Sequence, residues 1–532
     1  MYFGFVSFYA LYLGVYLVPA GVLLSLYQMY QVVYVYGLNK EAIHNIYVPL
    51  FACYVGIWAT LVIEKWKRKA SELSFRWDTT NHRPLEVTRS EFKGPELFDE
   101  VENQVHKHFT TQERCSRAIF GSPLWLLSLI VIVIVQVIRI NFKHNVANQM
   151  EFPKNRLYSV AGSCVQGAII AVLNIVYRRV AIFLTQWEVR SSFLDWCGWS
   201  VFGVPCSFSY LFLLLLFSSS HVVHAQNYQT ESQFQDALIF KIFIFQAING
   251  NLALVHAAFV DKDAVELWTL LIVLMAGVQI SNTAKQLILP KIKFCCRLRK
   301  KTEHRSKALT AVVPVAEGKD RSIEGKEHRE KKQSKNKKSK KKKSTETDND
   351  KDGDSHQSAN AVTEVLRNCA MNSQSSIGLI GDYAEMVSQF TYIVLWSAVF
   401  PLAPLFAVLV NYTQLRGEMS LACDNMKRND PEKADNIGAW LPILETVSMA
   451  AVVSNTVLIV HTFNSRLDFE ESFNHTQITV FKSDLSYFWL VAAIEHLVIV
   501  LKLILSYWMD DVPAWVNQLK KVEDARSRRK ME

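Results

Sequence analysis

Long apolar runs divide this sequence, and each is close to the length of a membrane-spanning helix. Half of the 532 residues are hydrophobic. Nearly all of them fall in runs of about 20, the length that a helix needs to cross a bilayer core of roughly 30 Å. We therefore predict an all-α polytopic membrane protein with ten transmembrane helices. The predicted spans are 3–30, 46–64, 118–140, 157–183, 237–260, 265–289, 383–399, 402–414, 440–463 and 486–508.

The positive charge of the chain predicts the orientation of these spans. The formal net charge is +9, and Lys and Arg are concentrated in four places between or after the spans. Basic loops mark the cytoplasmic side of a membrane. All four basic segments fit an even number of crossings with both termini in the cytosol. We expect the membrane to be the plasma membrane or the endoplasmic reticulum. The four basic segments are 65–69, 291–301, 427–428 and 520–530.

The start of the chain and one outside loop carry two further expectations. The first apolar run is too long for a removable signal peptide and lacks a basic flank, so we expect the sequence to begin inside a span. Either a soluble N-terminal cytosolic domain is missing from it, or none belongs to it. The predicted outside loop contains Asn474-His475-Thr476. This is a glycosylation acceptor or an unused sequon.

The same boundaries give the expected organisation of the chain. Two segments depart from the pattern of spans and short loops. The insertion 192–235 is apolar, but an independent crossing there would place one basic loop outside. It is re-entrant, lies on the membrane surface, or is a gene-model artefact. The segments are 1–64 (spans one and two), 65–117 (cytosolic loop), 118–191 (spans three and four), 192–235 (atypical apolar insertion), 236–290 (spans five and six), 291–378 (cytosolic lysine-rich disordered loop), 379–512 (spans seven to ten) and 513–532 (basic cytosolic tail).

The lysine-rich loop carries nine lysines in thirteen residues. Such a segment buries too little apolar surface to fold alone. It is either a solvated loop or a surface that attracts anionic lipid, at about 1 kcal/mol per basic residue. A nucleic-acid partner is not expected for a ten-span protein. The lysines are Lys331, Lys332, Lys335, Lys337, Lys338, Lys340, Lys341, Lys342 and Lys343.

Two acids stand at the start of the seventh predicted span. Asp382 and Glu385 are three residues apart, so both carboxylates lie on one face of a helix. An acid inside a membrane costs roughly 2.5 to 3.5 kcal/mol on insertion scales and usually faces a cavity, an ion or a partner. Two oxygen donors on one face suit a divalent cation such as calcium.

Two stretches of the sequence are specific enough to be compared with known families. One is Glu64-Lys65-Trp66-Lys67-Arg68 followed by Phe75-Arg76-Trp77-Asp78 and Arg83-Pro84, and the other runs from Gly277-Val278-Gln279 through Leu289-Pro290-Lys291. The first, which is the most specific, and the second, which is similar to a sixth span, together resemble the anoctamin family of calcium-activated chloride channels and phospholipid scramblases. The resemblance covers nearly the whole chain except 192–235 and 302–378. It implies a ten-helix homodimer of the anoctamin type.

The resemblance also implies a calcium site on spans six to eight, beside a groove built from spans three to seven. Glutamine stands at two positions where the family has acids, which implies weak or lost calcium binding because ligand charge tunes affinity. Alternatively, the remaining acids pair with Lys285 or Arg416, and the accessory pair are interfacial carboxylates that face solvent. The matching metal positions are Asp382, Glu385, Glu418 and Asn282, the substituted ones Gln286 and Gln414, and the accessory ones Glu64 and Asp511.

Polar residues on the fourth and fifth spans are candidates for lining the groove. Such residues can line a water-filled path for headgroups or anions. The long basic side chains can equally reach toward the membrane interface. The candidates are Asn174, Arg178, Lys241, Gln246 and Asn249.

These features predict a passive conduit, a phospholipid scramblase and/or chloride channel with weak or lost calcium gating. Its partners are membrane lipids, chloride or other small ions, an anionic lipid surface and a second copy of the chain. We expect no enzyme, because nucleophile-elbow, phosphate-loop and zinc-protease motifs are absent from the sequence. The alternative is a membrane-contact tether or scaffold that acts through the lysine-rich loop.

Overall fold

In the residues that it describes, the computed structural model contains fifteen helical segments and one short hairpin of two strands. They belong to two compact units. One unit comprises 1–284, 375–417 and 430–532, and the other 285–374 and 418–429. We describe each unit by itself. The described residues are 1–30, 47–79, 89, 96–99, 104–107, 126–141, 156–190, 230–261, 264–312, 364–365, 367–369, 371, 376–396, 399–427, 436–461 and 484–531.

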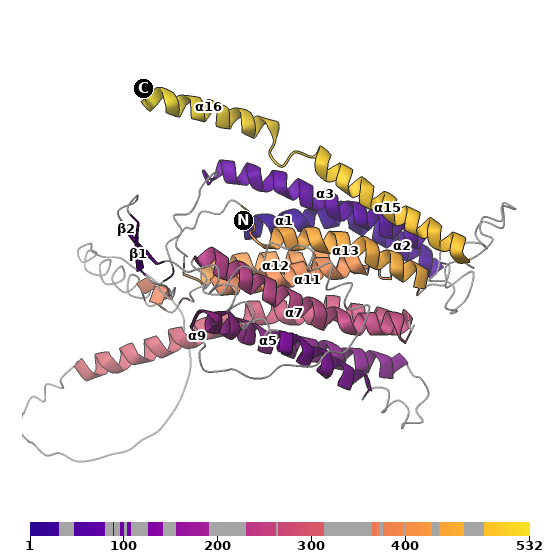
Figure 1. Cartoon of the computed structure of the whole chain (residues 1–532). Helices are drawn as coiled ribbons and strands as arrows, with labels where there is room; N and C mark the ends of the chain where they lie inside the picture. The colour runs from indigo at the N-terminus through magenta and orange to yellow at the C-terminus, as the bar shows by residue number, and fades with distance from the viewer. Residues whose placement is uncertain are drawn as a thin grey trace, which may run out of the picture. The chain divides into compact units, whose positions relative to one another are not determined.

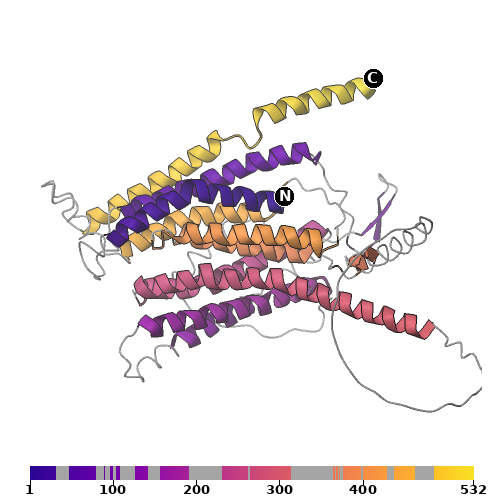
Figure 2. The ribbon, with the colours of Figure 1, turned by 180° about the vertical axis from the view of Figure 1, so that it is seen from behind.

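The first unit is a set of long helices that lie side by side (Figures 1 and 2). Helix α15 packs on α3, α3 on α13, α13 on α11, α11 on α7, and α7 on α5. Helices α9 and α12 each cross the boundary between the two units. The elements are α1 (Tyr2–Tyr12), η1 (Leu13–Leu17), α2 (Val18–Tyr30), α3 (Tyr47–Arg76), the helix Leu126–Asn141, α5 (Arg156–Arg190), α7 (Glu231–Phe259), α8 (Ala264–Ile272), η4 (Val273–Val278), α9 (Gln279–Val312), α11 (Ser376–Leu395), α12 (Ala403–Asp424), α13 (Trp440–His461), α15 (Asp484–Trp508) and α16 (Ala514–Met531).

Every predicted span has a helix at its place. Six helices in the described part of the chain are long and apolar enough to cross a membrane, and Leu126–Asn141 is a shorter apolar helix. The chain is therefore an integral multi-pass membrane protein. Length and composition identify six spanning helices among the described residues, whereas the apolar runs of the sequence predict ten spans. The six are Tyr2–Tyr30, Tyr47–Arg76, Ala161–Ile182, Glu231–Phe259, Glu266–Glu303 and Trp440–Ile459.

The structure departs from the predicted segments outside the spans. The predicted loop 65–117 begins with the last turns of α3 and contains an antiparallel pair of strands, β1 (Glu96–Asp99) and β2 (Gln104–Lys107). The fold is thus mainly rather than wholly helical. The predicted disordered loop 291–378 starts as helix, because α9 continues through Pro290 to Val312. The basic tail forms the helix α16.

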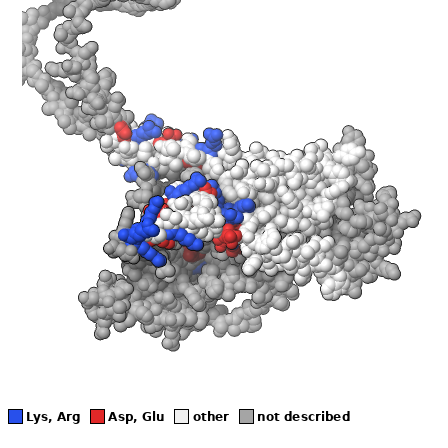
Figure 3. Space-filling model, turned by 90° about the horizontal axis from the view of Figure 1, so that it is seen from above, with Lys and Arg blue, Asp and Glu red and all other residues white. Residues whose placement is uncertain are grey.

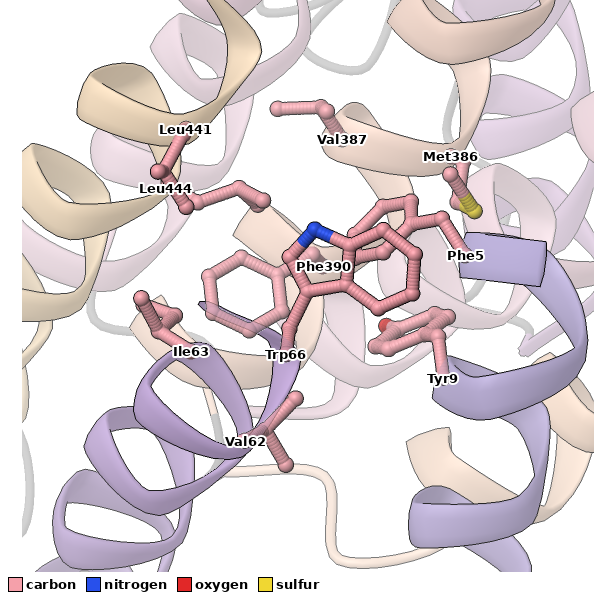
Figure 4. Close-up of a pocket in the computed structure, with 10 residues that line it drawn as sticks. All are labelled: Phe5, Tyr9, Val62, Ile63, Trp66, Met386, Val387, Phe390, Leu441 and Leu444. Atoms are coloured by element: carbon pink, nitrogen blue, oxygen red, sulfur yellow. The ribbon is translucent and has the colours of Figure 1, made fainter. Parts of the chain in front are cut away.

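Aromatic side chains from four helices fill the middle of the first unit. Phe5 on α1 packs against Trp66 on α3, with ring centroids 4.8 Å apart. Tyr383 on α11 stacks on Trp440 on α13 at 5.9 Å. Figure 4 shows a small pocket where these helices meet, lined by aromatic and aliphatic side chains. Its free volume is about 10 Å³, at or below the space that one water molecule needs. It is part of the core.

The outer faces of several helices carry large apolar side chains. Leu23 on α2, Ile138 on the helix Leu126–Asn141, and Trp489 on α15 are each more than half exposed. In Figure 3 the coloured charged residues gather at one end of the face shown, beside a broad white area. A surface of this kind suits contact with lipid, since the bilayer core is as apolar as these side chains.

The second unit consists of the later part of α9 and short segments beside it. Nζ of Lys301 donates a 2.9 Å hydrogen bond to the carbonyl oxygen of Cys369. Arg367 donates to the carbonyl oxygen of Asp424, at the end of α12, over 3.4 Å. Within the second unit, these two bonds connect the segment 367–369 to α9 and to the end of α12.

Candidate functional site

Four amide side chains, three of them buried, connect three helices of the first unit. Nε2 of Gln136 donates to Oδ1 of Asn249 over 2.9 Å, and Nε2 of Gln166 donates to Oε1 of Gln136 over 3.0 Å. The Asn249 amide in turn donates to Oδ1 of Asn174 over 2.9 Å and to the carbonyl oxygen of Ile170. Gln136, Gln166 and Asn249 are fully buried. This amide network joins Leu126–Asn141, α5 and α7.

The amide network clarifies two of the predicted groove residues. Asn249 donates to Asn174 and to the backbone of Ile170, so the two residues bind each other and the backbone. Interhelical hydrogen bonds inside a membrane contribute about 0.6 kcal/mol each on average, and up to about 1.7. In this structure the two residues therefore hold α5 against α7. Tyr177 and Phe245 stack across the same interface, with centroids 3.4 Å apart.

A second set of polar contacts joins α7 to α11. Gln246, which is buried, accepts a 3.3 Å hydrogen bond from Oγ of Ser388. One turn further on, Oδ1 of Asn251 accepts from Nε1 of Trp396 over 2.8 Å. Both contacts satisfy polar atoms that would otherwise be costly in an apolar interior. Gln246 is thus a link between helices as well as a groove candidate.

A third set connects α9, α11 and α12. Nε2 of Gln389 donates to Oε1 of Gln279 over 2.9 Å, and Oε1 of Gln389 accepts from Nδ2 of Asn411 over 2.9 Å. Gln389 and Asn411 are both buried. Together the three sets form a band of paired amides across the bundle. The band joins Leu126–Asn141, α5, α7, α9, α11 and α12.

The two basic groove candidates lie at partly buried positions on α5 and α7. Arg178 and Lys241 are half-buried. The guanidinium of Arg178 occupies the space beside Gly381 on α11, where a Cβ atom would lie 2.6 Å from Cζ. Arg179, the next residue, is exposed. Arg178 therefore faces the helix that carries the acid pair.

The predicted metal positions are only partly brought together. Asp382 and Glu385 lie on one face of α11, half-buried. Asn282 is half-buried on α9, and Gln414 is buried and donates to the Tyr2 hydroxyl over 3.3 Å. Glu418 and Gln286 belong to the second unit. Among the residues that the structure describes, no three His, Cys, Asp or Glu side chains form a group suited to a metal ion.

The accessory positions differ from each other. Glu64 is 3% exposed. Its Oε1 lies 3.2 Å from Nζ of Lys67 and accepts a 2.7 Å hydrogen bond from Oγ of Ser506. Lys67 also lies 2.7 Å from Oε1 of Glu445. Asp511, between α15 and α16, is exposed. Glu64 therefore already has a cationic side chain and a hydroxyl as partners.

Close to Glu64, a buried lysine joins α15 to two other helices. Lys502 is 2% exposed. Its Nζ donates to the carbonyl oxygen of Gly56 on α3 over 3.2 Å, and to both the carbonyl oxygen and Oγ of Ser448 on α13, over 2.6 and 2.7 Å. Three acceptors thus match the three donors of an ammonium group. Sequence analysis did not single out this residue.

Other residues of the site were also not predicted. Gln136 is the only amide within the apolar stretch 126–140, and an isolated polar residue in such a stretch is the signal that identifies it. Gln166, Gln389 and Asn411 show the same signal in their helices. The lysines from Lys331 to Lys343 and the acceptor Asn474 lie outside the described residues.

An apolar helical bundle crossed by a band of paired amides defines a multi-pass membrane protein with buried polar contacts between its helices. A sequence model of the anoctamin family, described as calcium-activated chloride channel, matches residues 1–194 and 208–523. The chain belongs to the anoctamin family. The match runs through 302–378 and most of 192–235, so the stretch outside the family is narrower than we expected.

Individual relatives agree with this assignment. Anoctamin-10 of Mus musculus is 26% identical over 477 residues, which cover 88% of this chain and 57% of the relative. Anoctamin-10 of Homo sapiens is 26% identical over 476 residues, with the same coverage. Anoctamin-7 of Mus musculus is 24% identical over 445 residues, covering 77% of this chain and 41% of the relative. The chain thus spans 57% of the length of the two anoctamin-10 relatives and 41% of the length of the anoctamin-7 relative.

Proposed function

We propose that this chain is a passive membrane conduit, a phospholipid scramblase and/or chloride channel whose calcium control is weak or lost. The observation that carries the proposal is the band of paired amides across otherwise apolar helices. Such groups are expensive in a membrane and are typical of a polar path through it. Membership of the anoctamin family supports the same class of activity.

The amides suggest how such a path would open. In the structure they bind each other, so α5 and α7 are held together at Asn174 and Asn249. Each amide has both donors and an acceptor. A lipid phosphate, chloride or water that enters between the helices can therefore replace an amide partner at a small net cost. Neither the exchange of an amide partner nor the passage of a lipid or an ion makes or breaks a covalent bond. We therefore propose no enzymatic reaction.

Weak calcium control follows from the residues present. Asp382 and Glu385 remain, whereas Gln286 and Gln414 stand where the family has acids. Fewer charged ligands lower calcium affinity. We propose at most one weakly bound ion, held by Asp382 and Glu385 with Asn282 within the first unit.

We further propose that the conduit has ten spans and that two copies of the chain form a homodimer. Helices α11, α12 and α15 have 20, 22 and 25 residues. At about 1.5 Å per residue each reaches roughly 30 Å or more, the thickness of a bilayer core. With Leu126–Asn141, these helices and the six long apolar ones make ten proposed spans.

Glycosylation of Asn474 in cells tests the proposed topology. We expect it if the loop after α13 lies outside, and we expect it to be lost in Asn474→Gln.

Reconstitution into liposomes tests the conduit. We expect flipping of labelled lipid, chloride flux, or both, above the rate in protein-free liposomes and nearly unchanged by calcium. A calcium-stimulated component that disappears in Glu385→Gln would instead show a working residual site. If neither lipid nor chloride moves faster than in protein-free liposomes, the conduit proposal is wrong.

The tether remains a second candidate because basic residues continue on the described helix α16. On this helix Lys521 and Arg528 are exposed and Lys520 is half-buried. Basic residues near an anionic membrane contribute about 1 kcal/mol each. Deletion of Lys331 to Lys343 should abolish enrichment at membrane contacts if the chain is a tether, and leave reconstituted flux intact. Unchanged enrichment with impaired flux would reject the tether.

A further inference from the structure

Two neighbouring cysteines lie on helix α9, just after its last apolar turns. Cys295 and Cys296 are both free thiols with exposed side chains. The helix continues past them to Val312. Both sulfur atoms are therefore presented on the surface of a regular helix, where a reagent outside the helix can reach them.

An exposed apolar stripe on the same helix leads to these thiols. It consists of Ile288, Leu289 and Ile292, which are each about half exposed. Residues three, four and seven apart lie on one face of a helix, so Ile292 is one turn and Ile288 two turns before Cys295. Phe294, on another face, is buried. The apolar stripe thus offers a hydrocarbon surface that ends at the cysteine pair.

The distance along the helix places the pair at the edge of a membrane. The spanning helix that contains η4 and most of α9 starts at Glu266. At about 1.5 Å per residue it reaches Cys295 after about 43 Å. A bilayer with its headgroups is roughly 40–45 Å thick. The thiols therefore lie at the depth of the headgroups, and the apolar stripe lies between them and the hydrocarbon.

Basic side chains around the pair indicate the side of the membrane. Lys291, Lys293 and Arg297 are exposed on the turns next to the cysteines. Basic residues at the end of a span mark the cytoplasmic side, and they attract its anionic lipids. A single acyl chain anchors a segment only weakly and reversibly, whereas a chain combined with a basic patch anchors it stably. The surroundings of the pair supply the basic patch.

We propose that Cys295 and Cys296 are a site of S-acylation by a long-chain fatty acid, whose chain lies along the apolar stripe. Cysteines beside a membrane span are typical acceptors of this modification. Sγ forms a thioester bond with the carbonyl carbon of a long-chain acyl-coenzyme A, and the bond from that carbon to the coenzyme's sulfur breaks. The thiol proton passes to the coenzyme A thiolate, and nothing is oxidised or reduced. A membrane acyltransferase catalyses the transfer. This site goes beyond the proposed conduit and does not depend on it.

Acyl exchange tests the site in the full chain, expressed in eukaryotic cells. Free thiols are blocked with N-ethylmaleimide, and hydroxylamine then cleaves the thioesters. Each released thiol receives a polyethylene glycol maleimide, which is counted as a shift in electrophoresis. The wild type should carry tags that depend on hydroxylamine, and the variant with both Cys295→Ser and Cys296→Ser should carry one or two fewer.

Cys423→Ser is the matched control and should carry as many tags as the wild type. Cys423 is also an exposed free thiol of the second unit, near the end of α12. One turn before it stands Ser420, and two turns before it Arg416, so no apolar stripe leads to it.

A second variant keeps both thiols and interrupts the apolar stripe. Ile288→Ser combined with Ile292→Ser should lower the tagged fraction at least twofold, at an expression level close to that of the wild type. Two results would overturn the inference. One is an equal number of tags in the wild type and the double serine variant of the cysteines, and the other is a tagged fraction unchanged by loss of the apolar stripe. Neither measurement depends on whether the chain passes lipid or chloride.

Discussion

The side-chain amide of Gln136 donates a 2.9 Å hydrogen bond to Oδ1 of Asn249, a residue 113 positions further along the chain. Both side chains are fully buried. Because Asn249 also donates to Asn174 and to the backbone of Ile170, one residue holds three helices together.

Replacing Asn249 by alanine should loosen this part of the bundle. The change removes three hydrogen bonds and leaves the buried Nε2 of Gln136 without its acceptor, at about 1–3 kcal/mol for an unsatisfied group. We expect a lower unfolding midpoint in detergent and a higher basal flux in liposomes. Asn174→Ala, which removes one bond of the network, should show a smaller effect. Equal, negligible effects of both substitutions would contradict the role of the network.

The close approach of α7 and α11 at Gly250 gives a second prediction. A Cβ atom at this position would overlap the hydroxyl of Tyr392 and lie 3.1 Å from its Cζ. Gly250→Ala should destabilise the protein by about 1–3 kcal/mol through overpacking. Tyr392→Phe should relieve most of that loss in the double variant, measured by thermal unfolding.

Gly14→Ala is the matched control for this substitution. The nearest atom to a Cβ there is Cγ2 of Val408, at an ordinary 3.9 Å. Alanine is also the better helix former by up to about 1 kcal/mol. The control should therefore be neutral or stabilising. A loss as large as that in Gly250→Ala would show that glycine is required for another reason.

Lys502 and Ser448 should be energetically coupled. Ser448→Ala removes the hydroxyl that accepts a 2.7 Å hydrogen bond from the buried ammonium. A hydrogen bond to a charged group contributes about 1.5–3 kcal/mol, so we expect a clear drop in the unfolding midpoint. In a Lys502→Met background the same substitution should cost almost nothing. Equal losses in both backgrounds would show that the hydroxyl acts independently of the lysine.

Two glutamates near Lys67 should differ in their contribution to stability. Glu64 is buried and bound by Lys67 and Ser506, whereas the side chain of Glu445 is 43% exposed. Exposed ion pairs contribute about 0–1 kcal/mol, and breaking a buried pair costs several times more. Glu64→Gln should therefore lower the unfolding midpoint far more than Glu445→Gln. The reverse order would contradict the assignment of Glu64 as the structural partner.

The helices could be predicted from the sequence because each consists of apolar residues along most of the length that crosses the membrane. The apolar runs around 3–30 and 440–463 are such cases, and both are helical spans in the structure. The ends are less well defined, since polar residues continue a helix beyond the membrane. Helix α9 reaches Val312 for this reason, although its last turns lie in a strongly basic sequence.

The partners of the polar residues could not be predicted in the same way. Asn174 and Asn249 were recognisable as groove candidates because each interrupts an apolar run. Their mutual bond, and the part of Gln136 in it, depend on which helices become neighbours and at what rotation. The same holds for Arg178, whose relation to Gly381 joins residues more than two hundred positions apart.

The three acceptors of Lys502 have a consequence for biosynthesis. The lysine lies in α15, while Gly56 and Ser448 lie on helices that are made earlier in translation. An ammonium group released alone into lipid would cost about 2.5–3.5 kcal/mol at the centre of the bilayer. Helix α15 is therefore made after the two helices that supply the acceptors of its lysine, so we expect Lys502 to find its partners only once α3 and α13 are in place.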